Sequence, residues 1–221
     1  MFSLSLFAQK TARTAVEKCA TMQRLQERLD RDPALQARFS AQRELFNRSM
    51  LQPAIQNRTA AESRTTIYIP VVFHVVLTNP SVVTDAQLQA QLDTLNKDFF
   101  GANGDSVRIP SYFKSVFGKS SIQFCLAQRT PDGDPTTGIV RTTTSQALFS
   151  TNDAVKHSTG GGDDIWDGDK YFNVWVCGLS GGVLGYATFP GDGSPTEQGV
   201  VMDYRSLPGG SYATYNGGKT L

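Results

Sequence analysis

Hydrophobic residues are spaced differently in the two parts of this chain. Between residues 10 and 50 they recur every three or four positions among Arg, Gln and Glu, a period that predicts amphipathic helices. Met22, Leu25 and Leu29 form the stripe of the first helix. From residue 67 onward, hydrophobic residues form short runs rich in β-branched side chains, which predict strands. A helical N-terminal part is therefore expected to precede a part built on a sheet.

The second helix of the N-terminal part has a defined start. Asp32 can accept hydrogen bonds from backbone donors at a helix N-terminus, and Pro33 suits the first helical position. Its hydrophobic stripe consists of Leu35, Phe39, Leu45 and Phe46. Because such a stripe is narrow, the helix must dock on another surface. Residues 10–64 are therefore interpreted as an appendage to the domain that follows. The aperiodic stretch 51–66 is the expected linker and contains the expected domain boundary.

The remainder of the chain predicts an α/β domain. Residues 67–77 (IYIPVVFHVVL) are hydrophobic on both faces, as expected for a central strand that is covered on both sides. Thr84 and Gln87 have the spacing of a capping box. The buried face of the helix that follows is expected to comprise Leu88, Leu92, Leu95 and Phe99. Further strands are expected at 121–128 and 171–177, and a strand–helix–strand order favours a right-handed crossover with parallel pairing.

The second half of the chain is expected to be rich in loops. All 20 glycines lie after residue 100. Residues 130–157 begin with a turn cluster and are expected to form a long polar connection. Two shorter strands are expected at 185–189 and 199–204, on either side of a polar loop.

Composition narrows the function classes. With 21 basic and 20 acidic residues, the net charge of +1 provides no electrostatic basis for binding nucleic acid or an anionic membrane. No hydrophobic run approaches the roughly 20 residues that span a bilayer. Three cysteines are too few for a disulfide scaffold. Residues 1–9 (MFSLSLFAQ) are short and hydrophobic, and are interpreted as the remnant of a secretory signal peptide.

The two histidines have no histidine partner at the spacing of a zinc helix. His74 lies within the central strand and is expected to be a hydrogen-bonded core residue, whereas His157 is expected in a solvated loop. A Cys–His hydrolase using Cys125 or Cys177 is the weaker alternative, because no local nucleophile signature accompanies either cysteine.

Six segments follow one another in a fixed order. They are IPVVFHVV at 69–76, QLQAQLDTLNKDF at 87–99, SIQFCLA at 121–127, a run at 160–179 that contains YFNVWVCGL, LGYATFP at 184–190 and GVVMDY at 199–204. Together they resemble the pappalysin and cytophagalysin family of metzincin zinc peptidases, over most of residues 65–221. The resemblance implies an N-terminal metzincin-like subdomain of α/β (α+β) class. Its sheet would have five strands, mostly parallel, with one antiparallel edge strand above the active-site cleft.

The resemblance also implies a substrate-binding rim. The antiparallel edge strand would lie at about 184–189, and an extended peptide can pair with such an edge through main-chain hydrogen bonds. Leu184, Gly185, Tyr186 and Ala187 are the expected substrate-binding residues. Considered without the resemblance, a short edge strand flanked by glycine is explained by the need to avoid aggregation.

In the family, a helix with the motif H-E-x-x-H-x-x-G-x-x-H follows a segment similar to Gly217-Gly218-Lys219-Thr220-Leu221. Its histidines bind zinc, and its Glu is the general base on the metal-bound water. The 221 residues contain no such motif. The expectation is therefore a zinc-dependent metalloendopeptidase represented by its prosegment and N-terminal half, without catalytic residues and inactive alone. A non-catalytic secreted peptide-binding module that uses the same sheet edge is the alternative.

Cys19 is a candidate latency ligand by the same resemblance. Family prosegments can carry a cysteine in a C-G-T context that caps the catalytic zinc, and this chain has Cys19-Ala20-Thr21. Ala20 replaces the glycine, which puts the backbone turn that would aim the sulfur in doubt. The alternative is a small hydrophobic residue that docks the appendage.

Other properties complete the expectation. In the strand order that the resemblance implies, the strands of Cys125 and Cys177 lie on opposite sides of the first strand, about 10 Å apart, so both thiols should be free. The acidic run 163–169 lacks the spacing of a calcium loop. The resemblance implies that calcium ligands lie mostly beyond Leu221, so calcium is a possible ligand of the complete enzyme and no residue of this chain is assigned to it. The partner is expected to be a protein or peptide substrate, and the location extracellular. The sequence does not specify an oligomeric state.

Overall fold

The computed structural model describes residues 18–51, 65–189, 191–192 and 194–221. The expected signal-peptide remnant and most of the expected linker lie outside the described residues. Among the described residues, no helix is long and hydrophobic enough to cross a membrane.

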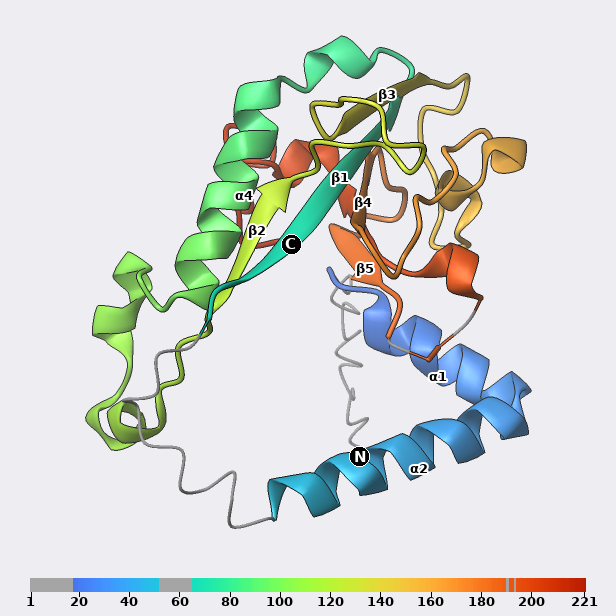
Figure 1. The fold of residues 1–221 in the computed structure, drawn as a ribbon. Helices are drawn as coiled ribbons and strands as arrows, with labels where there is room; N and C mark the ends of the chain where they lie inside the picture. Colours follow the sequence, from blue (N-terminus) through green and yellow to red (C-terminus); the bar gives the residue numbers. More distant parts are fainter. Residues whose placement is uncertain (1–17, 52–64, 190, 193) are drawn as a thin grey trace, which may run out of the picture.

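Two helices form the N-terminal part, as predicted. Helix α1 (Thr21–Arg31) lies beside strand β5 and is followed at a bend by α2 (Pro33–Met50), which extends away from the sheet (Figure 1). The Asp32 side chain accepts hydrogen bonds from the backbone N–H groups of Ala34 and Leu35, so the predicted N-cap is confirmed. Leu35 is buried.

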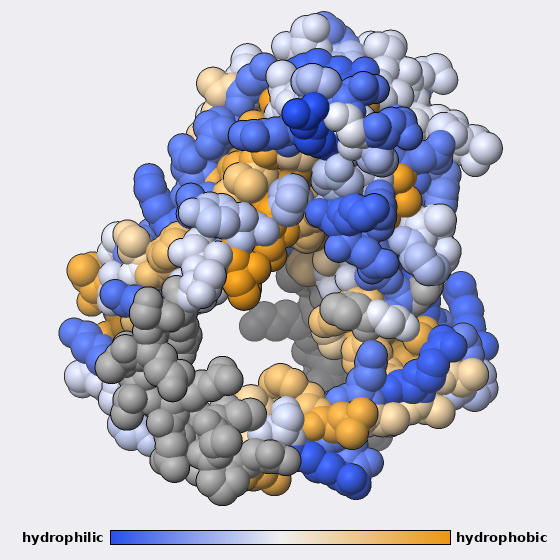
Figure 2. Space-filling view, viewed as in Figure 1, coloured by the Kyte–Doolittle hydropathy of each residue, from blue (hydrophilic) through white to orange (hydrophobic). Residues whose placement is uncertain are grey.

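The predicted hydrophobic stripe of α2 is only partly buried. Phe39 packs edge-on against Phe189, with ring centroids 5.8 Å apart. Leu45 and Phe46 are 65% and 62% exposed, so the prediction that they dock is wrong for the described residues. The physical reason is that α2 leaves the sheet after its first turns, and Figure 2 shows hydrophobic residues at its surface. Met22 of α1 is also 60% exposed.

One mixed sheet forms the second part and confirms the predicted fold class. Its strand order is β2-β1-β4-β6-β5, with β3 also paired to β1. Every pair is parallel except β5 with β6, which is antiparallel. The strands are β1 (Ile67–Leu77), β2 (Ile122–Leu126), β3 (Ile139–Thr143), β4 (Phe172–Cys177), β5 (Gly185–Ala187) and β6 (Val200–Asp203). Short 3₁₀ helices lie at Pro80–Val82, Gly104–Arg108, Ser111–Val116, Ala154–Lys156, Ser158–Gly160, Pro195–Glu197 and Tyr204–Ser206.

Strand β3 was not predicted, because it lies within the expected polar connection. Its sequence IVRTT contains only two hydrophobic residues, and no residue of it is fully buried. Both β2 and β3 pair with β1 on the side opposite β4, β2 along residues 67–71 and β3 along 73–77. The two strands therefore share one position beside β1, which reconciles six strands with the five positions that were expected.

Helix α4 (Asp85–Phe99) covers one face of the sheet (Figure 1). The predicted capping box is confirmed: the Thr84 hydroxyl accepts from the Gln87 backbone, and the Gln87 side chain accepts from the Thr84 backbone. Leu88, Leu92 and Leu95 are buried, as predicted. Phe99 is 38% exposed because it occupies the last turn, where it packs edge-on against Phe124.

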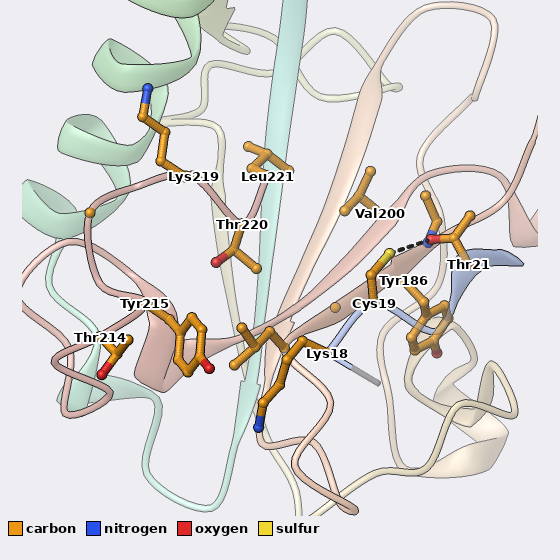
Figure 3. A pocket seen from close by; sticks show the side chains of 14 residues that line it. Lys18, Cys19, Thr21, Tyr186, Val200, Thr214, Tyr215, Lys219, Thr220 and Leu221 are labelled. Carbon is orange, nitrogen blue, oxygen red and sulfur yellow. Dashed lines mark hydrogen bonds between the residues drawn. The ribbon is translucent and has the colours of Figure 1, made fainter. Parts of the chain in front are cut away.

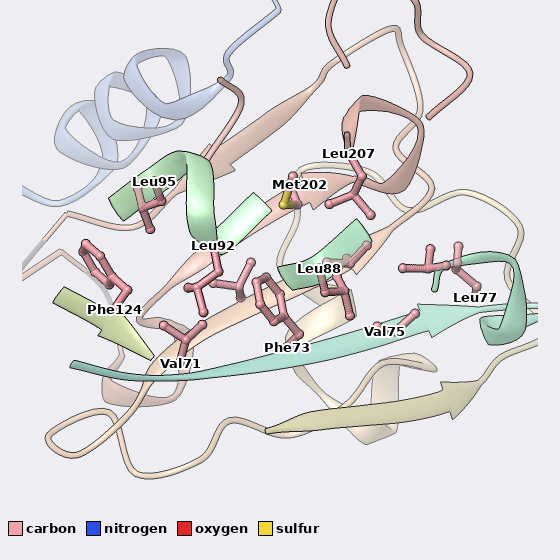
Figure 4. Close-up of a cluster of buried hydrophobic side chains, with 13 residues drawn as sticks. Val71, Phe73, Val75, Leu77, Leu88, Leu92, Leu95, Phe124, Met202 and Leu207 are labelled. Atoms are coloured by element: carbon pink, nitrogen blue, oxygen red, sulfur yellow. The ribbon is translucent and has the colours of Figure 1, made fainter. Parts of the chain in front are cut away.

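Strand β1 contributes to hydrophobic cores on both faces of the sheet. Val71, Phe73 and Val75 meet α4 in the core shown in Figure 4. Val76 points to the opposite face, into a second core that includes Trp175. The prediction of a central strand buried on both sides is confirmed, since the last seven residues of β1 are all buried.

Replacing Thr84 with Ala should lower the free energy of unfolding by about 1 kcal/mol, because a backbone donor of α4 then loses its partner. Urea unfolding followed by circular dichroism measures the change. Thr84→Ser is the matched control, since serine keeps the capping oxygen and should remain close to wild type. Equal loss in both variants would contradict a capping role.

Candidate substrate-binding edge

Strand β5 is the antiparallel edge of the sheet, as predicted from the family resemblance. On its inner side it pairs with β6, and the Leu184 carbonyl accepts a hydrogen bond from the Asp203 backbone at 2.8 Å. A Cβ atom on Gly185 would lie 2.8 Å from the Val201 carbonyl oxygen. Glycine at this position therefore permits the close approach of β5 to β6.

The outer side of β5 is occupied by residues 18–21, which we call the covering segment. The Leu184 N–H donates to the carbonyl of Lys18 at 2.8 Å, and the Ala20 N–H donates to the Gly185 carbonyl at 3.1 Å. Cys19 and Gly185 form a parallel β-bridge between these bonds. The free edge of the sheet is thus satisfied by another part of the same chain.

The remaining predicted rim residues have different surroundings. The Ala187 N–H donates to the Thr21 hydroxyl at 3.0 Å, so Ala187 also meets the covering segment. The Tyr186 side chain is buried on the face of the second hydrophobic core, so only its backbone belongs to the edge strand. The structure therefore brings the four predicted residues together but gives Tyr186 a core side chain.

A cavity of about 580 Å³ lies between the covering segment, β5 and residues 214–221 (Figure 3). Residues 214–221 are held to α4 by the buried Gln91, whose amide donates to the Gly218 carbonyl at 2.9 Å, and by an ion pair of Lys219 with Asp98 at 2.6 Å. The cavity is therefore bounded by three segments that are distant in sequence.

Cys19 lines this cavity. Its thiol is exposed and donates to the Thr21 hydroxyl at 3.3 Å, the dashed contact in Figure 3. Cys125 and Cys177 are also free thiols, as predicted, because their strands flank β1 from opposite sides. Burial, with the charge of Asp203 as a smaller contribution, raises the pKa of Cys177, so this thiol stays protonated.

An ion-pair cluster that the sequence did not reveal lies beside β5. Arg24 of α1 pairs with Asp153, whose other carboxylate oxygen lies 3.0 Å from the ammonium nitrogen of Lys156. One turn along α1, the Nε of Arg28 pairs with Asp192 at 3.0 Å. Its Nη2 reaches Glu197 at 3.2 Å. No local pattern marks these residues, since Arg24 and Asp153 are 129 positions apart.

Burial dominates the titration of this cluster. Lys156 is completely buried, and this desolvation lowers its pKa although Asp153 opposes the shift. Burial also raises the pKa of Asp192, against the opposing charges of Arg28 and Arg24. Charged groups in such a site depend on one another for compensation.

His74 is a satisfied core residue, as predicted. Its Nδ1 lies 2.5 Å from an Asp163 carboxylate oxygen and its Nε2 lies 2.9 Å from the Asn173 side-chain oxygen, while its ring stacks on Trp175. Both ring nitrogens are therefore engaged and neither is available to a metal. His157 is half-buried rather than fully solvated.

The described residues do not fit a zinc centre. They contain no group of three or more His, Cys, Asp or Glu side chains arranged to hold a metal ion. In the acidic run, hydrogen bonds from Ser158 lower the pKa of Asp164, and Asp167 pairs with Lys170 at 2.8 Å. These carboxylates have protein partners, and no reaction step can be assigned to a metal held by the described residues.

Curated proteins with similar sequences are metalloproteases. An extracellular metalloprotease of Verticillium alfalfae is 30% identical over 175 residues, which cover 74% of this chain and 51% of the relative. An extracellular metalloprotease of Colletotrichum graminicola is 28% identical over 165 residues, which cover 71% of this chain and 48% of that relative. This chain thus spans about half the length of the curated relatives it matches. No family model matches the chain.

Solved structures of mirolysin and promirolysin are similar to this chain in fold and sequence. Mirolysin in complex with compound 9 has a TM-score of 0.67 and 42% identity, and the match covers 71% of this chain and 60% of that one. Mature mirolysin of Tannerella forsythia in complex with a cleaved peptide has a TM-score of 0.63 and 43% identity, and the match covers 65% of this chain and 55% of that one. A promirolysin mutant from Tannerella forsythia has a TM-score of 0.68 and 34% identity, and the match covers 86% of this chain and 61% of that one. The fold is therefore metzincin-like, and the similarities support a relationship to a metallopeptidase family without singling out pappalysins or cytophagalysins.

Proposed function

We propose that this chain provides the substrate-binding part of a zinc-dependent metalloendopeptidase that acts outside the cell. Residues 10–64 would be its prosegment and linker, and residues 65–221 the N-terminal subdomain of its catalytic domain. The observation that carries the proposal is the pairing of the outer edge of β5 with an extended segment of polypeptide. The same backbone donors and acceptors would pair with an extended substrate.

Two findings about relatives support a peptide as the ligand of this edge. Mature mirolysin has been solved with a cleaved peptide, and this chain shares 43% identity with it over the matched region. The match extends over more of this chain when the solved protein is promirolysin, 86% against 71% and 65%. The additional coverage favours the interpretation of the N-terminal helices as a prosegment.

The covering segment would keep the proposed enzyme latent. While residues 18–21 occupy the outer edge of β5, a substrate cannot form the same hydrogen bonds. Cys19 would add a thiolate ligand for zinc, because its thiol is exposed and faces the cavity beside this edge. The zinc-binding residues themselves would belong to a longer polypeptide, since these 221 residues contain only two histidines, and His74 is fully engaged.

The 221-residue chain, purified without a tag, should bind no stoichiometric zinc and should not cleave casein. Metal analysis after gel filtration and a casein assay measure both. A longer product of the same gene is expected to contain an H-E-x-x-H helix, to bind zinc and to cleave casein. If the gene encodes no such motif, the peptidase proposal is wrong and a peptide-binding module on the same edge takes its place.

Replacing Cys19 with Ala in the longer protein should speed its activation, because the thiol would no longer occupy a position on zinc. The time course of prosegment loss and of casein cleavage measures this effect. Cys125→Ala is the matched control, because Cys125 lies in β2, away from the cavity. Identical activation of Cys19→Ala and wild type would show that Cys19 has no latency role.

A further inference from the structure

Residues 99–119, which connect the end of α4 to β2, form a loop rich in exposed hydrophobic side chains. We call it the aromatic loop. We propose that the aromatic loop binds the surface of an anionic lipid membrane, with its aromatic rings at the boundary of the hydrocarbon and its basic residues beside the lipid phosphates. Neither β5 nor the covering segment takes part, so this surface is independent of the peptidase function proposed above.

Hydrophobic side chains are exposed along the whole aromatic loop. Tyr112 is 83% exposed and Val107 is 79% exposed. The hydrophobic residues of the loop with exposed fractions of 38% or more are Phe99, Phe100, Val107, Tyr112, Phe113, Val116 and Phe117. Single exposed hydrophobic residues are normal on a protein surface, whereas a continuous group of them marks a surface that meets another one.

The aromatic loop has a defined shape. Its ends are joined, since the Ser120 N–H donates to the Phe99 carbonyl at 2.8 Å. Gly101 has a φ of 62°, and a Cβ atom there would lie 2.8 Å from the Phe117 ring, so glycine lets this ring close over the turn. The rings of Tyr112 and Phe113 pack edge-on, with centroids 5.1 Å apart. The exposed rings are therefore held by structured turns, which include the 3₁₀ helices Gly104–Arg108 and Ser111–Val116.

The net charge of +1 for the whole chain conceals a local excess of positive charge. The aromatic loop contains three basic residues, Arg108, Lys114 and Lys119, and one acidic residue, Asp105. Asp105 lies 3.7 Å from the ammonium of Lys219, which offsets its charge. Hydrophobic side chains surrounded by basic ones match the chemistry of an anionic lipid surface, where each Lys or Arg near the phosphates strengthens binding.

A second copy of this chain is a less suitable occupant of the same surface. In a two-fold dimer the same residues face one another, so Arg108 and Lys114 of both copies would be brought together. Like charges oppose such a contact, whereas lipid phosphates attract it. Tyrosine rings are also suited to the boundary between water and hydrocarbon, and a lysine can bury its stem while its ammonium stays in water. The charge of the loop therefore favours lipid.

The aromatic loop lies far from the β5 edge in the sheet. It leads directly into β2, which is at the opposite end of the strand order from β5. In Figure 1 it forms the left margin of the molecule, and hydrophobic residues are visible at this margin in Figure 2. A membrane bound at the loop would therefore not occupy the edge of β5.

Helix α2 is the other described surface with several exposed hydrophobic residues, and it provides the comparison. Leu45 and Phe46 are 65% and 62% exposed. Among the exposed hydrophobic residues of α2 only Phe46 is aromatic, and its Arg48 is paired with Glu44 at 2.5 Å. The aromatic loop thus offers more aromatic rings and more unbalanced positive charge than α2.

Co-sedimentation with lipid vesicles tests the proposal on the full 221-residue chain. Vesicles of equal parts phosphatidylcholine and phosphatidylglycerol should bind the chain at least about fivefold more tightly than vesicles of phosphatidylcholine alone, which is the effect of one basic residue at an anionic surface. Raising NaCl from about 50 mM to about 500 mM should weaken this binding, because salt screens the attraction. Absence of binding to the anionic vesicles, or equal binding to both kinds, would overturn the proposal.

Variants locate the surface that binds. The double variant Tyr112→Ser, Phe113→Ser should bind the anionic vesicles at least about tenfold more weakly, because two large hydrophobic side chains no longer leave water. The matched control is Leu45→Ser, Phe46→Ser in α2, which should bind like wild type. All four side chains are exposed, so both variants should keep the unfolding temperature of wild type. An equal loss of binding in the two variants would contradict a specific role of the aromatic loop.

Tyr112→Trp reports on insertion without removing a hydrophobic group. On anionic vesicles the added indole should emit at shorter wavelength and be quenched by brominated lipid, because it leaves water. The wild-type chain, whose Trp166 and Trp175 provide the background, is the control. If the chain binds vesicles while the added indole shows neither change, the loop stays in water and the proposal is wrong.

Sedimentation velocity without vesicles addresses the second copy. The chain should be monomeric at the concentrations at which it binds vesicles. A dimer that the double variant Tyr112→Ser, Phe113→Ser abolishes would assign the aromatic loop to a contact between copies and overturn the lipid proposal. None of these measurements requires zinc or catalysis, so their outcome is separate from that of the peptidase test.

Discussion

The structure depends on one constraint at β1: a central strand must be hydrogen-bonded on both edges and covered on both faces. β1 is eleven residues long, longer than any strand beside it, so β2 and β3 together are needed along one edge while β4 occupies the other. Its alternating side chains belong to two cores, one under α4 and one containing Trp175. The positions of β4, β6 and β5 follow, because each strand is paired in turn with its inner neighbour.

The need for hydrogen-bond partners along the edges of strands also explains why the N-terminal part is attached at β5. An edge strand exposes backbone groups that invite pairing with another chain, and the covering segment satisfies them here. Side chains reinforce the attachment, since the ion pairs of Arg24 and Arg28 are largely removed from solvent. Backbone pairing tolerates many sequences, whereas the arginine contacts are specific. The attachment of the N-terminal part therefore depends both on the edge of β5 and on these two arginines.

Local signals in the sequence predicted much of the fold correctly. The Thr84 capping box, the Asp32 cap and the buried run of β1 all depend on residues within a few positions of one another. β3 was missed because a half-exposed strand at a sheet margin carries a weak hydrophobic pattern. Leu45 was expected to dock because periodicity shows that a helix has a hydrophobic face, but not whether a surface meets it. The place of the β5 edge came from the family resemblance.

The sequence by itself determined most of the element types and the absence of a three-histidine zinc motif from these 221 residues, because each follows from residue type or short spacing. Only the tertiary structure shows that residues 18–21 pair with the edge of β5 and that Arg24 and Arg28 neutralise carboxylates beside it. The Arg24–Asp153 pair joins residues 129 positions apart, and Arg28 meets Glu197 across 169 positions. Ion pairs of this kind leave no periodic pattern, since a charged residue looks the same in a sequence whether it faces solvent or a buried carboxylate. Folding alone brings these charges into a site with little access to water.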